Sequence, residues 1–544
     1  MRVALMGKGN DMGLSAAKGT SSLGAWHKRS FRHLLHETNV FVTCVELVTS
    51  RGVITERSGR RVLELARELA HHPRIHALSL TDNPGGNAMI SADLLGTDLI
   101  SRGQDVIIHL SCKDWNRNAL QGRGWQLASE GFNNILALSG DYPTDGYQGH
   151  ASGVFDMDSV GLLKMFSDMN AGMALADAQS KLHRRMEPTQ LFLGAVVNNH
   201  KRYERELMPQ YFKLAKKIES GAQFIINQIG YDSRKQDELL KYMALRRLEV
   251  PVIANVYVLS AAAARYFHAD KIPGCVVTDE LLALSEEQAQ SPDKGKQFFL
   301  ELAARQCAIA KGLGFRGAYL GGHLRYEDYE RILELTDSFG EHDWKEFARQ
   351  ICFSQPDEFY FFEPDTVTGL SSSDINQGYL RSKTADALRA LKRSVPLGYR
   401  MNRSVHNAIF EDGSTGFAIG KRVSEAVERA GPGVQRALHG AEQALKILAF
   451  DCRDCGDCSL PDIAYLCPES QCAKNQRNGP CGGTRQGKCE VGEKDCIWAL
   501  AYDRLKAYGE EAAMLDRPVV IKDGQLKGTS AWANTFLKKD HHGK

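Results

Sequence analysis

The stretch from Val40 to Leu80, VFVTCVELVTSRGVITERSGRRVLELARELAHHPRIHALSL, contains one full unit of the pattern that decides the fold. Its apolar runs at residues 40–47 and 75–80 are typical of buried strands. Between them, residues 60–72 place apolar side chains at the spacing of an amphipathic helix. A strand, a helix and a second strand in this order predict two parallel strands joined by a helical crossover.

The same unit recurs over residues 38–335, where a second clear helix is predicted at residues 205–221. The predicted strands are VFVTCVEL (40–47), IHALSL (75–80), DVIIHLSC (105–112), NILALSG (134–140), LFLGAVV (191–197), AQFIINQI (222–229), PVIANVYVL (251–259) and GFRGAYLGG (314–322). Eight strands that alternate with helices favour a closed (β/α)8 TIM barrel. An open doubly wound sheet is the alternative, but no G-x-G-x-x-G follows any of these strands, which counts against a dinucleotide-binding fold.

Composition and charge exclude several classes of protein. The chain has 544 residues, 43% of them hydrophobic and 25% charged, with a net charge of +2. This near-neutral balance does not favour a nucleic-acid or membrane partner, and no apolar run approaches the roughly 20 residues that span a bilayer. The first thirty residues lack a long apolar segment of the signal-peptide type, so we expect a cytoplasmic protein.

Changes in composition along the chain predict five segments. They are a flexible N-terminal segment (1–37), the barrel (38–335), a mixed connecting region (336–449), a cysteine-rich metal-binding domain (450–510) and a polar C-terminal tail (511–544). The tail ends in KKDHHGK, and we interpret its histidine pair as a solvated chain end rather than a ligand site.

The thirteen cysteines are distributed very unevenly. Five occur singly, as expected of small buried hydrophobic side chains: Cys44, Cys112, Cys275, Cys307 and Cys352. The other eight lie within residues 452–496. Without a secretion signal, such a cluster favours metal ligation over a disulfide framework.

The cysteine spacing predicts two sites of four thiolates each. Cys452, Cys455 and Cys458 follow one another at x₂ spacing, and the later Cys467-Pro468 is typical of the end of a ferredoxin-type run. We therefore predict one [4Fe–4S] cluster on these four thiols. The second site comprises Cys472, Cys481, Cys489 and Cys496. Zinc remains the alternative, either alone as a structural knuckle or mixed with iron, although structural zinc sites usually present two separated Cys-x₂-Cys pairs.

Polar residues occur where successive strands end, which is where barrel enzymes place their chemistry. These positions are Glu46, the loop 81–86, His109, Asp141, Gln228, Asp232 and the segment from Tyr319 through His323 to Arg325. A solid barrel core prefers Val, Ile and Leu, so the repeated polar residues favour a site. Glu46 alone could equally be paired with a barrel arginine, and Asp141 also suits the turn Gly-Asp-Tyr-Pro.

Several of these stretches carry a family resemblance. CVEL (44–47), SLTDNPGG (79–86), VIIHLSCKDWNRN (106–118), GFNNILALSGDYP (131–143) and GAQFIINQIGYD (221–232) resemble, in order and spacing, the methylenetetrahydrofolate reductases. The resemblance implies a flavin-containing barrel that interconverts 5,10-methylenetetrahydrofolate and 5-methyltetrahydrofolate. The segments 467–483 and 487–509 resemble the cysteine-rich C-terminal domain that accompanies some of these enzymes.

The resemblance also implies roles for individual residues. Glu46 matches the catalytic acid, which delivers a proton to N10 of the folate so that the methylene ring opens. Asp141 matches an aspartate that tunes the site, Gln228 an amide that binds the pterin, and Arg325 falls near a substrate-side arginine. The positions that match the flavin site are Thr81, His109, Ser139, Gly140, Asp141, His200 and Lys217.

This sequence departs from the family pattern at three places. Ser139 stands where an arginine is often found, and Val196 stands where a tyrosine is expected. The last strand, which is aromatic-rich in the family, is here AYLGGHLR (318–325). These positions match the sites of the flavin phosphates and the nicotinamide donor. FAD or FMN as the flavin, and NAD(P)H or a protein as the electron donor, therefore stay open.

The function predicted from the sequence is a flavin-dependent oxidoreductase of one-carbon metabolism that acts on tetrahydrofolate derivatives. Its iron–sulfur domain is expected to relay electrons to a partner protein or to stabilise the fold. The alternatives are a corrinoid- or folate-linked methyltransferase on the same barrel, and an inactive electron-transfer or scaffold subunit. A second copy of the chain, in a homo-oligomer, is a further candidate partner.

Overall fold

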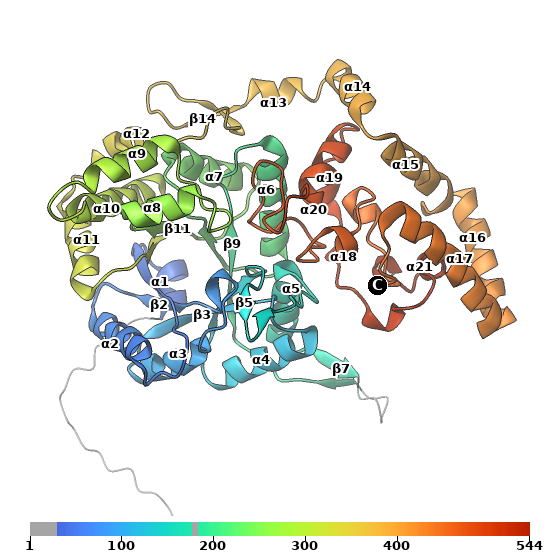
Figure 1. Ribbon diagram of the computed structural model, residues 1–544, viewed down its shortest axis with the longest axis horizontal. Helices are drawn as coiled ribbons and strands as arrows, with labels where there is room; N and C mark the ends of the chain where they lie inside the picture. The colour runs from blue at the N-terminus through green and yellow to red at the C-terminus, as the bar shows by residue number, and fades with distance from the viewer. Residues whose placement is uncertain (1–29, 177–182, 544) are drawn as a thin grey trace, which may run out of the picture.

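The computed structural model describes residues 30–176 and 183–543 and shows a closed barrel with a second module packed against one side (Figure 1). The barrel strands are β1 (Val42–Leu47), β2 (Ala77–Leu80), β3 (Asp105–Ser111), β4 (Asn134–Leu138), β9 (Phe192–Val197), β10 (Phe224–Asn227), β11 (Val252–Tyr257) and β12 (Gly317–Gly321). Each strand is parallel to its neighbours, and β1 closes the ring by pairing with β12 and β2. The predicted (β/α)8 barrel is confirmed, and each predicted strand contains one observed strand.

Helices surround the barrel because their apolar faces pack on the outer faces of the strands. They are α2 (Arg57–His71), α3 (Ala92–Ser101), α4 (Arg117–Ser129), α5 (Ser159–Asn170), α6 (Glu204–Glu219), α7 (Ser233–Leu245), α8 (Ala261–His268), α9 (Asp279–Gln288), α10 (Lys296–Leu313) and α11 (Tyr326–Ser338). The two helices predicted at residues 60–72 and 205–221 correspond to α2 and α6. Two short hairpins extend from the loops, β5 (Asp145–Gly146) with β6 (Gly149–His150) and β7 (Ala174–Ala176) with β8 (His183–Arg185).

The barrel interior is closed at its amino end by α1 (Phe31–Glu37). Phe31 is fully buried, and its ring lies 5.4 Å from that of Phe224 in an edge-on contact. Residues 31–37 are therefore a plug, because their apolar side chains complete the inner core, and they are not part of a flexible segment. Residues 1–29 of that predicted segment lie outside the described residues.

The connecting region leaves the barrel and continues as a line of helices around the second module (Figure 1). Its elements are α12 (Asp343–Gln350), β13 (Phe362–Pro364), β14 (Ser371–Ile375), α13 (Gln377–Arg381), α14 (Ala385–Ser394), α15 (Leu397–Ile409), α16 (Thr415–Ala430) and α17 (Pro432–Phe450).

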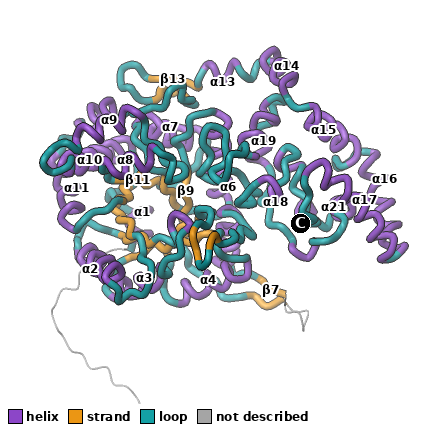
Figure 2. Tube along the Cα trace, in the orientation of Figure 1, coloured by secondary structure: helices purple, strands orange, loops and turns teal. Residues whose placement is uncertain are grey.

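The second module, formed by residues 451–543, consists mostly of loops (Figure 2). Its short helices are η2 (Pro461–Ile463), α18 (Pro468–Gln471), α19 (Ile497–Lys506), α20 (Ala513–Asp516), η3 (Gly524–Leu526), α21 (Ala531–Phe536) and η4 (His541–Gly543). We expected residues 511–544 to form a separate tail, but Asn534 donates to the carbonyl of Gly456 and Val520 accepts from Asn478. Residues 511–543 therefore fold onto the cysteine-rich loops.

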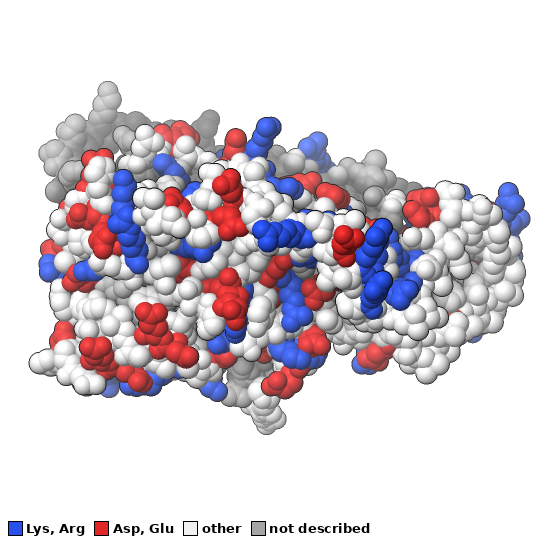
Figure 3. All heavy atoms as spheres, turned by 90° about the horizontal axis from the view of Figure 1, so that it is seen from above, with Lys and Arg blue, Asp and Glu red and all other residues white. Residues whose placement is uncertain are grey.

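The surface carries charges of both signs. On the face drawn in Figure 3, Lys and Arg side chains are interspersed with Asp and Glu side chains, as the net charge of +2 predicts. Within the described part of the chain, no helix combines the length and the apolarity that crossing a bilayer requires.

Candidate active site and thiol clusters

A cavity of about 300 Å³ opens at the carboxyl end of the barrel. Its floor and walls come from strand ends, and one side is closed by the second module. The barrel residues include Glu46, Thr81, His109, Ser139, Gly140, Asp141, Lys213, Lys217, Gln228 and Tyr319, and the module supplies Lys474, Pro480, Cys481, Gly482, Gly483 and Glu490.

Glu46 lies near the end of β1 and faces this cavity. The hydroxyl of Tyr319, on β12, donates a hydrogen bond of 2.9 Å to its Oε2. Burial raises the pKa of Glu46, and the hydrogen bond from Tyr319 opposes that rise to a lesser degree. The Glu46 carboxyl therefore retains its proton to a higher pH than an exposed glutamic acid does.

A neutral hydrogen-bonded group extends from Glu46 across the barrel. Tyr319 Oη lies 3.2 Å from Nε2 of His109, and Ser79 Oγ lies 2.8 Å from the same nitrogen. Burial lowers the pKa of His109 to about 4, so the imidazole is uncharged near neutral pH. Burial likewise raises the pKa of Tyr319 well above its usual value. Tyr319 was named only as the start of the polar segment that ends at Arg325 and was given no role. Ser79 was not predicted as a site residue, although its inward position on β2 was a usable signal.

Asp141 is held at the cavity rim by the loop after β2. Its Oδ2 accepts a hydrogen bond of 2.7 Å from the backbone N–H of Gly85. The next residue, Gly86, has φ +74°, and a Cβ there would lie 2.2 Å from the carbonyl oxygen of Tyr142. A glycine is needed at this point because the two loops approach so closely. Thr81 belongs to the same loop and lines the cavity.

Gln228 and Lys217 reach the cavity from neighbouring elements. Gln228 follows β10, and its Oε1 accepts from the backbone N–H of Ile229 at 2.9 Å. Lys217, on α6, donates to the carbonyl of Val196 at 2.5 Å. Burial lowers the pKa of Lys217 to about 7, so this amine loses its proton far more readily than an exposed lysine.

Ser139 and Gly140 line the cavity and also contact the second module. Ser139 Oγ donates to Oε1 of Gln476 at 3.0 Å, and the Gly140 carbonyl accepts from Nζ of Lys474 at 2.7 Å. Lys474 forms an ion pair with Glu490. The part of the barrel that the sequence assigns to the flavin therefore adjoins the cysteine-rich domain.

Two predicted site residues do not line this cavity. His200 is buried with its ring against Gly230, where a Cβ would lie 2.2 Å from the imidazole. Burial lowers the pKa of His200 to about 3, and its Nε2 has no hydrogen-bond partner among the residues described. Arg325 is exposed and precedes α11, where it belongs to a capping box with Asp328.

The buried Lys213 on α6 fastens the second module to the barrel, a role that the sequence pattern did not indicate. Lys213 is 2% exposed and donates to Gln476 Oε1 at 2.8 Å and to the carbonyl of Gly479 at 3.0 Å. It also lies 4.0 Å from the carboxylate of Asp158. The signal was faint, because lysines on an amphipathic helix usually face solvent.

Four of the clustered cysteines surround a small cavity between the end of α17 and α18. They are Cys452, Cys455, Cys458 and Cys467, the four thiols grouped by their spacing. Lys446 Nζ lies 3.6 Å from Sγ of Cys458, and Arg477 lines the same cavity. Burial raises the pKa of the Cys458 and Cys455 thiols, and Lys446 and Arg477 respectively oppose that rise.

The other four cysteines surround a second small cavity, together with Gln476 and Trp498. They are Cys472, Cys481, Cys489 and Cys496. Cys481 and Glu490 also line the barrel-mouth cavity, so this second quartet adjoins the site of Glu46. Gln476 lines the second thiol cavity and the adjacent Arg477 lines the first, so consecutive residues connect the two quartets.

The described thiols of each quartet do not form a compact group of ligand atoms. Within the described ranges, no three cysteine sulfurs belong to a group of ligand atoms that all lie within 4.8 Å of one another. Four sulfurs around one zinc, at Zn–S about 2.3 Å, are about 3.8 Å apart. The described thiols are therefore not arranged as the four ligands of a single zinc ion.

Comparison with solved structures finds distant similarities. An uncharacterised protein from Clostridium thermocellum that binds two copies of 5-methyl-5,6,7,8-tetrahydrofolic acid is 15% identical, with 54% of this chain and 93% of that chain covered and a TM-score of 0.36. Oxaloacetate acetylhydrolase with 3,3-difluorooxalacetate is 12% identical (54% and 80% covered, TM-score 0.30), and 2,3-dimethylmalate lyase is 11% identical (53% and 77%, TM-score 0.30). These TM-scores are below 0.5, so the similarities do not bear on function. No curated protein matches the chain.

Family comparison assigns both parts of the molecule. Residues 55–316, within the barrel, match the family described as methylenetetrahydrofolate reductase. Residues 431–525, which include all eight clustered cysteines, match the domain described as methylene-tetrahydrofolate reductase C terminal. The chain therefore belongs to the methylenetetrahydrofolate reductase family, with the reductase barrel followed by the C-terminal domain of that family.

Proposed function

We propose that the protein is a flavin-dependent oxidoreductase that interconverts 5,10-methylenetetrahydrofolate and 5-methyltetrahydrofolate. The observation that carries the proposal is Glu46, a carboxyl of raised pKa at the floor of the barrel-mouth cavity. Gln228 and Asp141 line the same cavity. An acid, an amide and a carboxylate around one cavity are the groups that folate binding and proton transfer require.

The cavity also has the chemistry that a flavin needs. Its volume of about 300 Å³ is at the lower end of typical cofactor pockets. Apolar side chains such as Leu138, Val196 and Ile229 offer walls for a flat ring system, and hydroxyl, imidazole and amine groups stand at its edges. The candidate contacts are Thr81, His109, Ser139, Gly140, Asp141 and Lys217. When bound, the flavin supplies hydride transfer; we propose FAD, and the mass of the extracted flavin distinguishes it from FMN.

The residues of the chain handle the proton and the substrate. Glu46 delivers a proton to N10 of the folate, because its raised pKa keeps the proton available near neutral pH. The hydroxyl of Tyr319 orients that carboxyl. Gln228 binds the pterin edge, and the Asp141 carboxylate stabilises positive charge that develops on the substrate as the ring opens. The same residues serve the reverse direction.

We infer that the two cysteine quartets hold metal and that at least the first holds a [4Fe–4S] cluster. The x₂ spacing of Cys452, Cys455 and Cys458, and the cavity that they line together with Cys467, support this assignment. Cys481 lines both the barrel-mouth cavity and the second thiol cavity, which suits transfer of electrons between the flavin site and a partner protein. Zinc in the same places would stabilise the fold without carrying electrons.

The test is a visible spectrum of the anaerobically purified protein before and after dithionite, followed by turnover of methylenetetrahydrofolate. Flavin bands that bleach, together with folate turnover, support the proposal. Methyl transfer by a protein without flavin would indicate the methyltransferase instead. Neither bound flavin nor turnover would indicate a scaffold subunit.

A further inference from the structure

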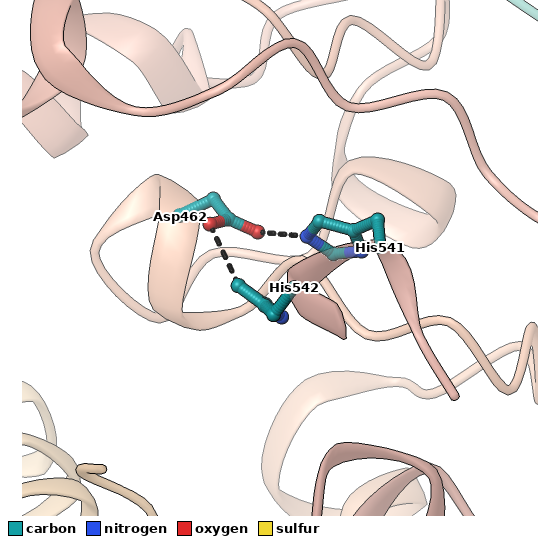
Figure 4. A group of neighbouring side chains, drawn as sticks. All are labelled: Asp462, His541 and His542. Atoms are coloured by element: carbon teal, nitrogen blue, oxygen red, sulfur yellow. Dashed lines mark hydrogen bonds and ion pairs between the residues drawn. The ribbon is translucent and has the colours of Figure 1, made fainter. Parts of the chain in front are cut away.

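A third cluster of ligand-type side chains lies outside the barrel and outside both thiol quartets (Figure 4). It joins Asp462, in the turn η2 between Cys458 and Cys467, to His541 and His542 in η4. Asp462 and His541 are 7% and 8% exposed, whereas the side chain of His542 is 29% exposed. The histidine pair that we expected at a solvated chain end is thus packed against the cysteine-bearing loop.

Both histidines turn the same ring nitrogen towards one carboxylate. Nε2 of His541 lies 2.9 Å from Oδ2 of Asp462, and Nε2 of His542 lies 3.1 Å from Oδ1. One ligand atom from each residue lies within 4.8 Å of the others, and no other such group occurs in the part of the chain that the structure describes. Ligands about 2.1 Å from a tetrahedral zinc are about 3.4 Å apart. Each histidine nitrogen therefore needs to move only a few tenths of an ångström from the carboxylate oxygen that it now contacts.

The other ring nitrogen of each histidine is held by a further carboxylate. His541 Nδ1 bonds to Asp457, and His542 Nδ1 lies 3.4 Å from Oδ2 of Asp540. Asp457 is itself fixed by the backbone N–H of Asp523 at 2.8 Å. A histidine that binds metal through one nitrogen usually donates the other N–H to a carboxylate, which sets its tautomer and orientation. Both supporting carboxylates are already in place.

The cluster is already a network of ion pairs. Burial alone would lower the pKa of both histidines, but hydrogen bonds to Asp457, Asp462 and Asp540 raise both, that of His542 to about 10. Metal binding therefore replaces one proton on each imidazole. Two basic residues belong to the surroundings of the cluster. Lys216 on α6 interacts electrostatically with Asp462, and the guanidinium of Arg517 donates a hydrogen bond to the carbonyl of Pro461. A divalent cation that displaces the two imidazole protons keeps the buried carboxylates paired, as buried charges require.

We propose that Asp462, His541 and His542 bind one divalent transition-metal ion, for which zinc is the prototype. The fourth position faces the side where His542 is exposed and takes a water molecule. Two imidazole nitrogens and one carboxylate oxygen suit zinc and its neighbours, whereas magnesium and calcium prefer oxygen ligands alone. The ion fastens the last residues of the chain to the loop between Cys458 and Cys467, so it braces the first thiol quartet. Both histidines lie outside residues 431–525, which match the family domain.

The test compares metal content in the full-length protein, purified anaerobically so that the thiol sites stay loaded, and then equilibrated with zinc and desalted. Wild type is expected to hold one more zinc per chain than His542→Ala, which removes the most exposed ligand. His268→Ala is the matched control, because His268 pairs with the single carboxylate of Asp279 at 2.7 Å. The control is expected to hold as much zinc as wild type.

X-ray absorption at the zinc edge is expected to show that the additional ion has only nitrogen and oxygen neighbours. Asp462→Asn, which preserves the shape of the carboxylate, is expected to lose the same ion. This variant takes the place of His542→Ala in the test if His542→Ala does not fold. Zinc contents equal to wild type in folded His542→Ala or Asp462→Asn would overturn the proposal. So would an additional ion with sulfur ligands, since that ion belongs to the thiol sites.

Discussion

At the scale of single residues, the proposed chemistry depends on how Glu46 is held. Its carboxyl is the acid of the barrel-mouth cavity, and Tyr319 and His109 are its buried neighbours. Because His109 is neutral and Tyr319 stays protonated, no buried cation compensates a negative charge on Glu46 within this group. The protonated acid is therefore favoured.

Replacing Glu46 with Gln is expected to abolish nearly all reduction of methylenetetrahydrofolate while flavin content is retained. The amide has a similar shape but cannot deliver the proton, and general acid catalysis contributes about 10²–10⁴-fold. Steady-state rates and the flavin-to-protein absorbance ratio measure the two effects. Turnover close to wild type would remove Glu46 from the mechanism.

Replacing Tyr319 with Phe is expected to shift the pH profile of folate reduction. The hydroxyl of Tyr319 lowers the pKa of Glu46, so its loss raises that pKa further and keeps the acid protonated to higher pH. A hydrogen bond to a charged group is worth about 1.5–3 kcal/mol, which moves the alkaline limb of kcat/KM upward by about 1–2 pH units.

The matched control for Tyr319→Phe is Tyr231→Phe, because the hydroxyl of Tyr231 donates to the backbone carbonyl of Tyr257 rather than to Glu46. Its pH profile is expected to coincide with that of wild type. An alkaline limb that stays in place or moves to lower pH in Tyr319→Phe would contradict the assignment of Glu46 as the acid.

Replacing Gln228 with Ala is expected to raise the KM for folate roughly fivefold, since a lost neutral hydrogen bond costs about 1 kcal/mol. Flavin content should not change, because Gln228 is proposed to contact the pterin. Substrate-dependent rates and the absorbance of bound flavin measure the two. Loss of flavin in this variant would mean that Gln228 faces the cofactor instead.

At the scale of elements, the cysteine-bearing loops divide into two groups that the chain connects directly. The first quartet lies where α17 ends and the second adjoins the barrel mouth, with Gln476 and Arg477 between them. Each group of four thiols forms a separate cavity, so each site should be removable on its own.

Replacing Cys455 with Ser is expected to remove the iron and acid-labile sulfide of the first site while the second site keeps its metal. Cys352→Ser is the control, because Cys352 lies near Asp232, away from both quartets. Iron, sulfide and zinc analysis after anaerobic purification measures the result. Stoichiometric zinc without iron or sulfide in wild type would leave a structural role only.

At the scale of the whole molecule, the second module is part of the site rather than an appendage. It closes one side of the barrel-mouth cavity and is fastened to α6 by buried polar contacts. The helices α15 and α16 leave apolar side chains such as Leu397, Met401 and Ile419 exposed. Binding of a partner protein and assembly into a homo-oligomer both stay predictions.

Replacing Lys213 with Met is expected to lower the free energy of unfolding by about 3 kcal/mol, because breaking a buried charged contact leaves Asp158 less compensated. Denaturant unfolding followed by tryptophan fluorescence measures this loss. Lys164→Met is the matched control, because Lys164 pairs with Asp168 on the surface of α5 and such pairs contribute about 0–1 kcal/mol. Equal effects of the two variants would contradict the role of Lys213 in docking.

Much of the molecule follows from local patterns in the sequence. Strand and helix periodicity predicted the barrel, since each element is encoded by neighbouring residues. The spacing of Cys452, Cys455, Cys458 and Cys467 predicted which thiols line one cavity. The x₂ spacing confines the first three to one loop, and Cys467 reaches the same cavity from the start of α18. The position of Glu46 at the end of an apolar strand predicted that it faces the barrel mouth. Each of these properties depends on residues that are close together in the chain.

Only the tertiary structure decided which distant groups meet. Tyr319 contacts Glu46 because the barrel closes between its last and first strands, and Lys213 is buried because the second module covers α6. Sequence reasoning placed His541 in solvent, which was wrong, since Asp457 and Asp462 bury it from more than seventy residues away. Local periodicity carries no information about such contacts, because the burial and pKa of a side chain depend on what the folded chain packs against it.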